Sequence, residues 1–183
     1  MRMVERFARS LAPDSFVERV TDLRPEALKA DGIEGLILDL DNTLCEWQSE
    51  VIPEDILHWL QEVQEAGICL CLASNTHNRR RLDRVARALN IPYVRGVPKP
   101  RRQCFAKAFL HMNCRPEAVA VAGDQMFTVI LGGKRSGIRT IMVRPIHPRE
   151  FIGTKLSRML EERLLRWFER HNLLPIVGNG QSK

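Results

Sequence analysis

The stretch GLILDLDNTL, residues 35–44, decides the fold of this chain. It opens with a short apolar run, which is typical of a buried strand in a parallel sheet. Two carboxylates, Asp39 and Asp41, stand where that strand ends. Because ligands of such sheets bind beyond the carboxyl ends of the strands, this stretch predicts a strand that carries acidic side chains to a functional edge.

Apolar runs and helical patterns alternate along the rest of the chain. Strands that alternate with helices of about a dozen residues indicate a parallel sheet covered on both faces. We therefore predict an α/β fold of three layers, α/β/α, around a mainly parallel, Rossmann-like sheet. Further strands are predicted at residues 68–73, 92–95, 118–122 and 140–143, and helices at residues 53–67, 78–90, 102–112, 127–136 and 149–171.

The length of 183 residues suits one domain with a full hydrophobic core. We expect an N-terminal segment packed on that core at residues 1–30, the main domain at residues 31–172 including a C-terminal helix, and a flexible tail at residues 173–183. The chain has five cysteines and no CxxC motif. This usage indicates buried, reduced thiols and a cytoplasmic protein. No apolar stretch is long enough to span a bilayer.

The chain is basic, with a formal net charge of +6 and a pI of about 9.4. That balance favours anionic partners such as phosphate esters, nucleic acid or an anionic membrane, although a solvated basic surface explains it equally well. Several arginines follow the predicted strands and could form a cationic rim; the alternative is that they lie on the polar faces of ordinary helices. They are Arg79, Arg80, Arg81, Arg101, Arg102 and Arg144.

Polar side chains follow three further predicted strands as well. This regularity is more informative than one acidic strand end, because the carboxyl ends of parallel strands meet at one edge of the sheet. The side chains are Ser74 and Asn75 after the second strand, Lys99 after the third and Asp124 after the fourth.

These residue types suit phosphoryl transfer. An aspartate can attack phosphorus and form an acyl phosphate, which divides a difficult hydrolysis into two easier steps. A second carboxyl group can protonate the leaving oxygen and then deprotonate water. Several carboxylates can share a site with a phosphate dianion only if cations neutralise them, and Mg²⁺ with a lysine does so. Hydroxyl groups and backbone N–H groups can bind the phosphate oxygens.

The four strand ends resemble motifs one to four of the haloacid dehalogenase superfamily phosphatases, in order. The motifs are Asp-Leu-Asp-Asn-Thr-Leu at residues 39–44, Ser-Asn at 74–75, Lys-Pro at 99–100 and Gly-Asp-Gln at 123–125. Over residues 11–170 the chain resembles the YqeG-type subfamily IIIA. That subfamily includes phosphatidylglycerophosphate phosphatases. The resemblance implies a magnesium-dependent phosphate monoester hydrolase with an aspartyl-phosphate intermediate, and phosphatidylglycerophosphate as its substrate.

The resemblance also implies a role for each matching residue. Asp39 would be the nucleophile and a metal ligand. Asp41 would be the general acid and base, with its backbone carbonyl on the Mg²⁺, and Asp124 would complete the metal ligands. Lys99 would neutralise the phosphate and the nucleophile. The residues expected to bind the substrate are Ser74, Asn75 and Thr43.

Two positions depart from the subfamily pattern. Val129 stands where the subfamily usually has an acid that supports the metal through water, and loss of such a partner commonly lowers metal affinity or activity about 10–100-fold. Lys134 replaces the usual asparagine, and a lysine near a site that lacks one carboxylate is electrostatically consistent. These departures keep a second function open, namely a phosphatase-derived protein that binds nucleic acid or a phosphorylated partner with weak or no turnover.

The intervals between the motifs have no room for a cap domain. Residues 45–52 can form a loop only, and residues 76–98 one helix and one short strand. An open site suits a phosphate that projects from a lipid at a membrane surface, a protein or a nucleic acid, and a second subunit could also close it. We therefore expect a cytoplasmic protein that is peripheral at the membrane if its substrate is a lipid.

The last predicted helix carries apolar residues at a spacing of four. A basic amphipathic helix with aromatic side chains can lie at a membrane interface, but glutamates offset most of its positive charge. We prefer a helix packed on its own sheet, and membrane attachment is the alternative. The apolar residues are Ile152, Leu156, Leu160, Leu164 and Phe168.

Overall fold

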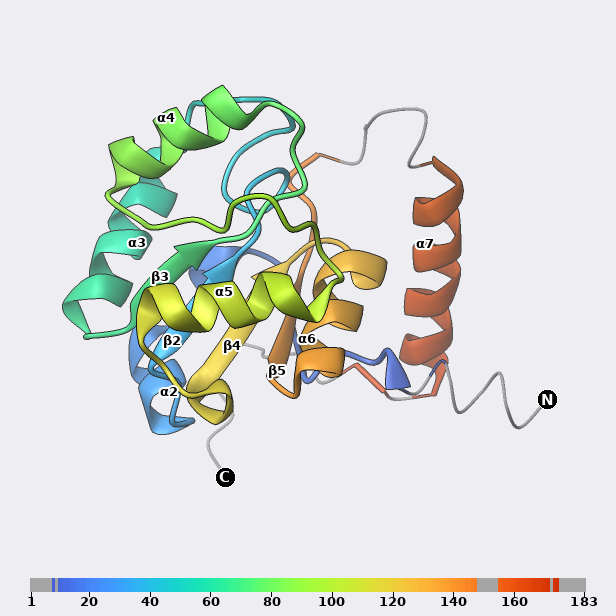
Figure 1. The fold of residues 1–183 in the computed structure, drawn as a ribbon. Helices are drawn as coiled ribbons and strands as arrows, with labels where there is room; N and C mark the ends of the chain where they lie inside the picture. Colours follow the sequence, from blue (N-terminus) through green and yellow to red (C-terminus); the bar gives the residue numbers. More distant parts are fainter. Residues whose placement is uncertain (1–7, 9, 148–154, 172, 175–183) are drawn as a thin grey trace.

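The computed structural model describes residues 8, 10–147, 155–171 and 173–174, and its centre is a sheet of five parallel strands (Figure 1). The strands lie in the order β1-β5-β4-β2-β3, so β2 is hydrogen-bonded to both β3 and β4. Their bounds are Ser15–Val17 (β1), Gly35–Leu38 (β2), Cys69–Leu72 (β3), Val119–Gly123 (β4) and Arg139–Val143 (β5). The α/β fold with a parallel sheet is confirmed.

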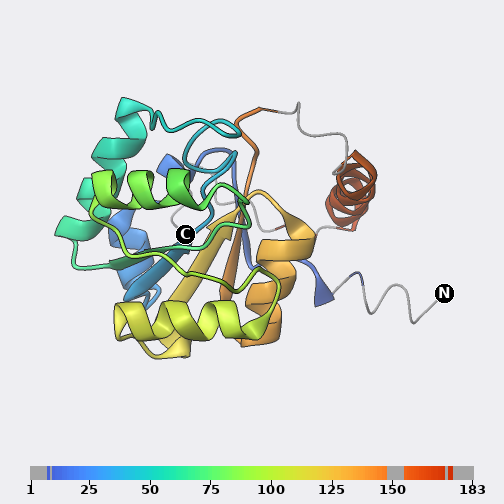
Figure 2. The ribbon, with the colours of Figure 1, turned by 45° about the horizontal axis from the view of Figure 1, so that its top comes forward.

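Helices cover both faces of the sheet and produce three layers (Figure 2). One face carries α2 (Pro25–Ala30), α3 (Glu54–Glu65) and α4 (Arg79–Leu89). The other carries α5 (Arg102–Met112), the π-helix η3 (Met126–Ile130), α6 (Leu131–Ser136) and α7 (Lys155–Arg170). Two 3-10 helices, η1 (Val20–Asp22) and η2 (Pro116–Ala118), lie in connections. The three-layer prediction is therefore confirmed as well.

The unbroken apolar sequence of β2 follows from its central place. Successive side chains of a strand point to opposite faces, and both faces of this strand are covered. Leu36 and Leu38 join the apolar cluster that includes α3 and α4, whereas Ile37 joins the cluster that includes α5 and η3. The loop that leaves β2 therefore starts from a strand held on both faces and along both edges.

The structure differs from the predicted strands in two places. β1 pairs in parallel with β5 at the edge of the sheet, although the sequence analysis predicted no strand there. The strand predicted at residues 92–95 is wrong, because only a single bridge joins Tyr93 to Leu72. β1 has only three residues. Such a short segment cannot show the alternation of side chains that identifies a strand in a sequence.

The connections leave the carboxyl edge of the sheet open. Residues 46–53, between the last bridge of the first motif and α3, contain no helix or strand, and one helix alone, α4, lies between Ser74 and Lys99. The predicted absence of a cap domain is confirmed. Within the described residues, no helix is both long and apolar enough to cross a membrane.

α7 packs on the molecule through Glu161, Leu164 and Phe168. Phe168 is fully buried, and Leu164 packs against the same apolar cluster, whereas Leu160 is exposed. The backbone N–H of Phe127 in η3 donates to Glu161 Oε1 at 3.2 Å. The predicted packing of this helix on its own core therefore holds at these positions. Ile152 and the side chain of Leu156 lie outside the described part of the chain.

The cysteines are free thiols, and most are inaccessible. Cys45, Cys71 and Cys104 are buried as predicted, but Cys69 is exposed, so the prediction is wrong there. Burial raises the pKa of Cys45 to about 11 and that of Cys71 to about 12. These two thiols are therefore protonated at neutral pH.

Candidate active site

The first motif begins where β2 meets its two neighbours. The backbone N–H of Asp39 donates to Ala122 O at 3.0 Å, and that of Ala73 donates to Leu38 O at 2.9 Å. The ladder thus continues one residue past the ends of the strands. Asp39 is only 4% exposed. Its position is fixed by the sheet rather than by a flexible loop.

Asp39 and Lys99 form a buried ion pair. Lys99 Nζ lies 2.7 Å from Asp39 Oδ2, and both side chains are almost inaccessible to solvent. The other carboxylate oxygen, Oδ1, accepts a hydrogen bond from the N–H of Leu40 at 2.8 Å. Within the described residues the Lys99 ammonium has no hydrogen-bond acceptor with suitable geometry. A bound phosphate would supply acceptors for its free N–H groups.

Asn75 holds the backbone of Lys99. Its Nδ2 donates to Lys99 O at 3.0 Å, and its Oδ1 accepts from Lys99 N at 2.8 Å. This is a different role from the substrate contact that the sequence predicted. Because the amide fixes both backbone groups of Lys99, it aligns the segment that delivers the ammonium to Asp39.

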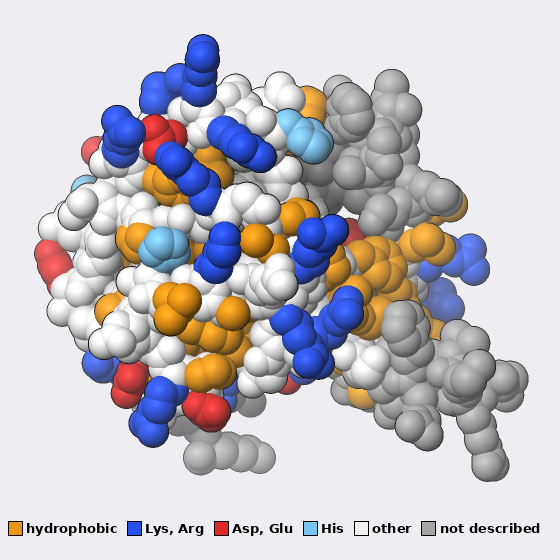
Figure 3. All heavy atoms as spheres, viewed as in Figure 1, with side chains coloured by type: hydrophobic (Ala, Val, Ile, Leu, Met, Phe, Trp, Pro, Cys, Tyr) orange, Lys and Arg blue, Asp and Glu red, His pale blue; other side chains and the backbone are white. Residues whose placement is uncertain are grey.

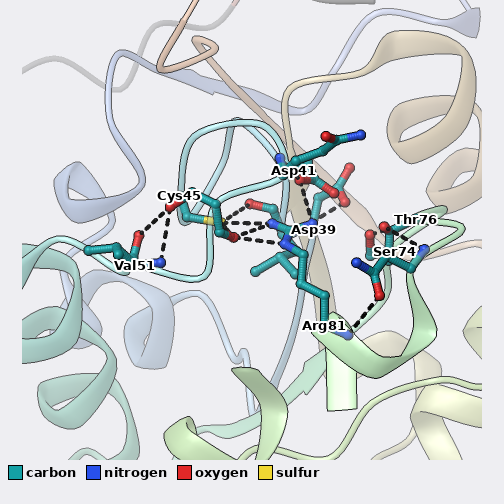
Figure 4. Close-up of polar contacts among 11 residues, drawn as sticks. Asp39, Asp41, Cys45, Val51, Ser74, Thr76 and Arg81 are labelled. Carbon is teal, nitrogen blue, oxygen red and sulfur yellow. Dashed lines mark hydrogen bonds and ion pairs between the residues drawn. The ribbon is translucent and has the colours of Figure 1, made fainter. Parts of the chain in front are cut away.

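Asp41 lies beside Asp39 in the first-motif loop and contacts an arginine (Figure 4). Asp41 Oδ1 accepts from Gln48 N at 2.9 Å and lies 2.8 Å from Arg81 Nη1. Arg81 is 1% exposed, so the prediction that it belongs to a cationic rim is wrong. The sequence carried no signal for this, since Arg79 and Arg80 beside it are exposed as expected.

Ser74 also lies at this edge, after β3. Its hydroxyl oxygen accepts from the backbone N–H of Thr76 at 3.2 Å, and the residue is half-buried (Figure 4). The hydroxyl hydrogen remains available to a phosphate oxygen. Thr43 is 1% exposed, and its Oγ1 has no partner within the described residues. Its hydroxyl thus lies beneath the loop surface rather than in the mouth of the site.

Asp124 follows β4 directly and is 1% exposed. A Cβ built on the preceding Gly123 would lie 2.9 Å from Asp39 Cβ and 2.8 Å from Val129 Cγ2. Only glycine lets the end of β4 approach Asp39 and Val129 so closely. Asp39 and Asp124 therefore stand on adjacent strand ends, and Val129 lies against the same point from η3.

The residues present fit Mg²⁺ by their chemistry. Within the described residues, no three His, Cys, Asp or Glu side chains gather as a complete set of ligands. The predicted ligand set does not need three such side chains. It comprises the carboxylates of Asp39 and Asp124 and the backbone carbonyl of Asp41. Mg²⁺ prefers oxygen ligands and usually keeps several waters or binds substrate phosphate. Two carboxylates and one carbonyl suit that preference.

Lys134 does not lie at this site. Its ammonium pairs with Asp14, which also accepts from the backbone N–H of Thr140 at 2.8 Å near the start of β5. The start of a parallel strand lies at the opposite edge from the carboxyl ends. The premise that Lys134 lies near the site that lacks an acid at Val129 is therefore wrong.

Comparison with known proteins identifies the family. The profile of the family described as mitochondrial PGP phosphatase matches residues 3–147. The chain belongs to this family. One relative of the chain is the probable phosphatase YqeG of Bacillus subtilis. The two are 36% identical, over 86% of this chain and 91% of the relative. The chain is thus a phosphatase of the haloacid dehalogenase type, a phosphoric monoester hydrolase.

Two plastid relatives carry a substrate in their names. Phosphatidylglycerophosphate phosphatase 1 of Chlamydomonas reinhardtii is 30% identical, over 74% of this chain, and that of Arabidopsis thaliana is 26% identical, over 86%. The aligned regions cover 54% and 49% of those proteins, so the chain spans about half of their length.

Solved structures resemble the fold of this PGP phosphatase family member. An uncharacterized protein from Listeria monocytogenes superposes with a TM-score of 0.52 at 14% identity, covering 73% of this chain and 99% of that one. One from Corynebacterium glutamicum gives 0.50 at 16% identity, covering 73% and 96%. At these identities the likeness describes the fold alone.

Proposed function

We propose that the protein hydrolyses phosphate monoesters through a covalent intermediate on Asp39. The observation that carries the proposal is the buried pair of Asp39 and Lys99, with an ammonium nitrogen 2.7 Å from the carboxylate. A buried carboxylate beside a cation with spare donors can receive a phosphate group without strong charge repulsion. The neighbouring Asp41 supplies a second carboxyl group within the same loop.

The steps follow from these residues. The Asp39 carboxylate attacks phosphorus and forms an acyl-phosphate bond while the bond from phosphorus to the leaving oxygen breaks. Asp41 gives its proton to that oxygen, then takes a proton from water as the water attacks the phosphoryl group and releases Asp39. Lys99 and the Ser74 hydroxyl bind phosphate oxygens during both steps. When bound, Mg²⁺ neutralises charge on the phosphate oxygens, and the groups that would hold it are the side chains of Asp39 and Asp124 and the Asp41 carbonyl.

For the substrate we propose phosphatidylglycerophosphate, met at a membrane surface by a cytoplasmic protein. The names of the family and of the plastid relatives support this choice. No cap domain is inserted within residues 42–147, all of which the structure describes, and this suits a phosphate that projects from a large body. Lys and Arg side chains lie over α4 and around the start of α5 (Figure 3), including the exposed Arg79, Arg80, Arg101 and Arg102. Positive charge there would attract an anionic lipid surface.

The test is phosphate release from phosphatidylglycerophosphate in vesicles, from glycerol 3-phosphate and from p-nitrophenyl phosphate, each with Mg²⁺ and with a chelator. We expect metal-dependent release, fastest with the lipid, and its loss in Asp39→Asn. Faster turnover of a soluble ester would contradict the lipid substrate but not the phosphatase. Release that survives in Asp39→Asn would contradict the nucleophile.

The alternative of a binding protein with little turnover is favoured by one observation. Val129 is fully buried against Gly123, so an apolar side chain occupies the place of the supporting acid. A nucleic-acid partner would bind with a steep salt dependence. Tight, salt-dependent binding of an oligonucleotide by well-folded protein that releases no phosphate from any of the three esters would favour this function.

A further inference from the structure

Arg81 joins the first-motif loop to α4 through several groups at once. Its Nη1 lies 2.8 Å from Asp41 Oδ1, its Nη2 donates to Cys45 Sγ at 3.3 Å, and its Nε donates to Ser49 O at 2.8 Å (Figure 4). These partners span residues 41–49. The planar guanidinium offers donors in a fixed fork, which allows one side chain to hold separate acceptors.

The burial of Arg81 makes this arrangement specific. It is among the largest side chains that are fully buried. A buried cation is costly unless it is paired and hydrogen-bonded, and Asp41 supplies the paired charge. Separating the pair would leave the buried guanidinium without this counter-charge, which disfavours separation.

The two carboxylate oxygens of Asp41 have different surroundings. Oδ1 accepts a hydrogen bond from Gln48 N at 2.9 Å and forms an ion pair with Arg81, whose Nη1 lies 2.8 Å away without the geometry of a hydrogen bond. No described residue binds Oδ2, while the side chain stays 15% exposed. The anchored oxygen fixes the direction of the free one. A carboxyl group held in this way presents a single oxygen for proton transfer.

The anchor of Arg81 is itself rigid. Arg81 lies in the first turn of α4, where its backbone N–H donates to the capping Asn78 Oδ1 at 3.0 Å. The segment that leads from β3 into this helix contains Asn75, which fixes Lys99. The side chains that place Asp41 and Lys99 thus start from the same connection.

We propose that Arg81 is a positioning residue for the reaction: its buried guanidinium holds Asp41 Oδ1, so that Oδ2 transfers the proton to and from the leaving oxygen. This inference rests on the proposed function. The guanidinium does not touch the phosphate and acts through Asp41. Loss of Arg81 should therefore slow the steps that need proton transfer and leave phosphate and metal binding nearly unchanged.

Leaving-group dependence separates this role from a structural one. An alkyl alkoxide needs a proton as it leaves, whereas p-nitrophenolate leaves readily without one. General acid catalysis contributes about 10²–10⁴-fold where it is needed. For Arg81→Met we expect kcat/KM to fall about 100-fold with an alkyl phosphate and much less with p-nitrophenyl phosphate. Arg81→Lys should recover part of the alkyl activity.

Arg84 provides the matched control. It also extends from α4 to the same loop, where its Nε donates to Glu50 at 2.8 Å, but it is exposed. Arg84→Met removes a connection between helix and loop without touching Asp41. We expect it to keep wild-type activity with both substrates. Thermal unfolding shows whether each variant is folded. If Arg81→Met does not fold, Arg81→Lys is used for the comparison instead.

The closing experiment measures kcat/KM with both substrates for wild type, Arg81→Met, Arg81→Lys, Asp41→Asn and the double variant Arg81→Met/Asp41→Asn. The expected result is a loss confined mainly to the alkyl phosphate, and no further loss when Arg81→Met is added to Asp41→Asn. An equal loss with both substrates, or losses that multiply in the double variant, would overturn the inference while leaving the phosphatase intact. A wild type without activity on either ester would instead overturn the proposed function.

Discussion

Two ion pairs lie at the carboxyl edge of the sheet, and three of their four side chains are buried, with Asp41 partly exposed. Asp39 pairs with Lys99, and Asp41 with Arg81. Burying a charge is costly, so pairs of this kind do little for the net stability of a fold. Under the proposed function, these pairs would hold the reacting carboxylates in fixed positions before substrate arrives.

The first prediction concerns the unpaired charge that remains when one partner is removed. Lys99→Met should lower the free energy of unfolding by about 3–5 kcal/mol, because it leaves the Asp39 carboxylate buried without its cation. Urea unfolding measures this change. Adding Asp39→Asn to Lys99→Met removes that charge too, and the double variant should regain much of the lost stability. A double variant less stable than Lys99→Met would contradict the pairing.

The second prediction concerns the missing acid. Val129→Asp places a carboxylate next to Gly123 and Asp39, where it can support a metal through water. We expect the Mg²⁺ concentration for half-maximal activity to fall about tenfold. Without Mg²⁺ the variant should be less stable than wild type, because its new carboxylate is buried. Val129→Asn is the control without charge, and an equal metal response in both variants would contradict this role.

The sequence predicted which residues belong to the site, but it did not predict the contacts that they make. The apolar runs of β2 and β4 placed Asp39, Asp41 and Asp124 after strands, whereas Lys99 follows a segment that forms no strand. The sequence could not show that Asn75 binds the Lys99 backbone, since that contact joins residues 24 apart. Nor could it separate Arg81 from two neighbouring arginines, because burial depends on which face of α4 meets the loop.

At the scale of the element, α6 approaches the sheet and α5 through a pair of glycines. A Cβ built on Gly132 would lie 2.4 Å from Phe105 Cε2, and one on Gly133 would lie 2.5 Å from Thr140 Cγ2. Such distances leave no room for a side chain. The close packing holds η3 and α6 against β4, and so fixes the segment that follows Asp124.

The third prediction follows from this close packing. Gly132→Ala should lower the free energy of unfolding by about 1–3 kcal/mol, because the added methyl group overpacks against Phe105. Chemical denaturation measures the loss. The double variant Phe105→Leu/Gly132→Ala relieves the clash, so it should cost less than the sum of the two single changes. Simple additivity would contradict the contact.

The fourth prediction concerns β5 and the segment before β1. Burial raises the pKa of Asp14, but hydrogen bonds from Lys134 and Thr140 outweigh it, so the net pKa lies below the ordinary value of 3.8. A lowered pKa stabilises the fold above about pH 4 and loses this effect as the pH falls. Asp14→Asn should therefore lower the melting temperature at pH 7 and have little effect near pH 3.

Asp31 supplies the control for this pH dependence. It pairs with Arg139 near the same edge, but its side chain is 58% exposed. Exposed pairs contribute about 0–1 kcal/mol, so Asp31→Asn should change the melting temperature little at either pH. A loss in Asp14→Asn that persists undiminished at pH 3 would show that its charge is not responsible.

Helices and strands were predicted best where their apolar pattern is clear and continuous. The helix at residues 102–112 has the predicted bounds, and the four apolar runs that became β2–β5 were found within two residues at each end. Around Tyr93 only the hydrogen bonds of one bridge to Leu72 form, and the local sequence carried no signal that the pairing would stop there. The π-helix at the start of the 127–136 helix also depends on packing against β4 and β5 rather than on residue type.

At the scale of the whole molecule, the open carboxyl edge and the charge distribution bear on substrate size. No inserted domain covers the site within residues 42–147, which the structure describes throughout. An uncovered edge is compatible with the proposed lipid substrate, and the net charge of +6 would favour approach to an anionic surface.

The central claim is that Asp39 carries the phosphoryl group during turnover. The most direct measurement is an acid quench during hydrolysis of a ³²P-labelled ester with Mg²⁺, followed by peptide mapping. An aspartyl phosphate survives acid and is released by hydroxylamine. We predict hydroxylamine-labile label on the peptide that contains Asp39, and none in Asp39→Asn. Full turnover in Asp39→Asn, or label on another peptide, would contradict the account.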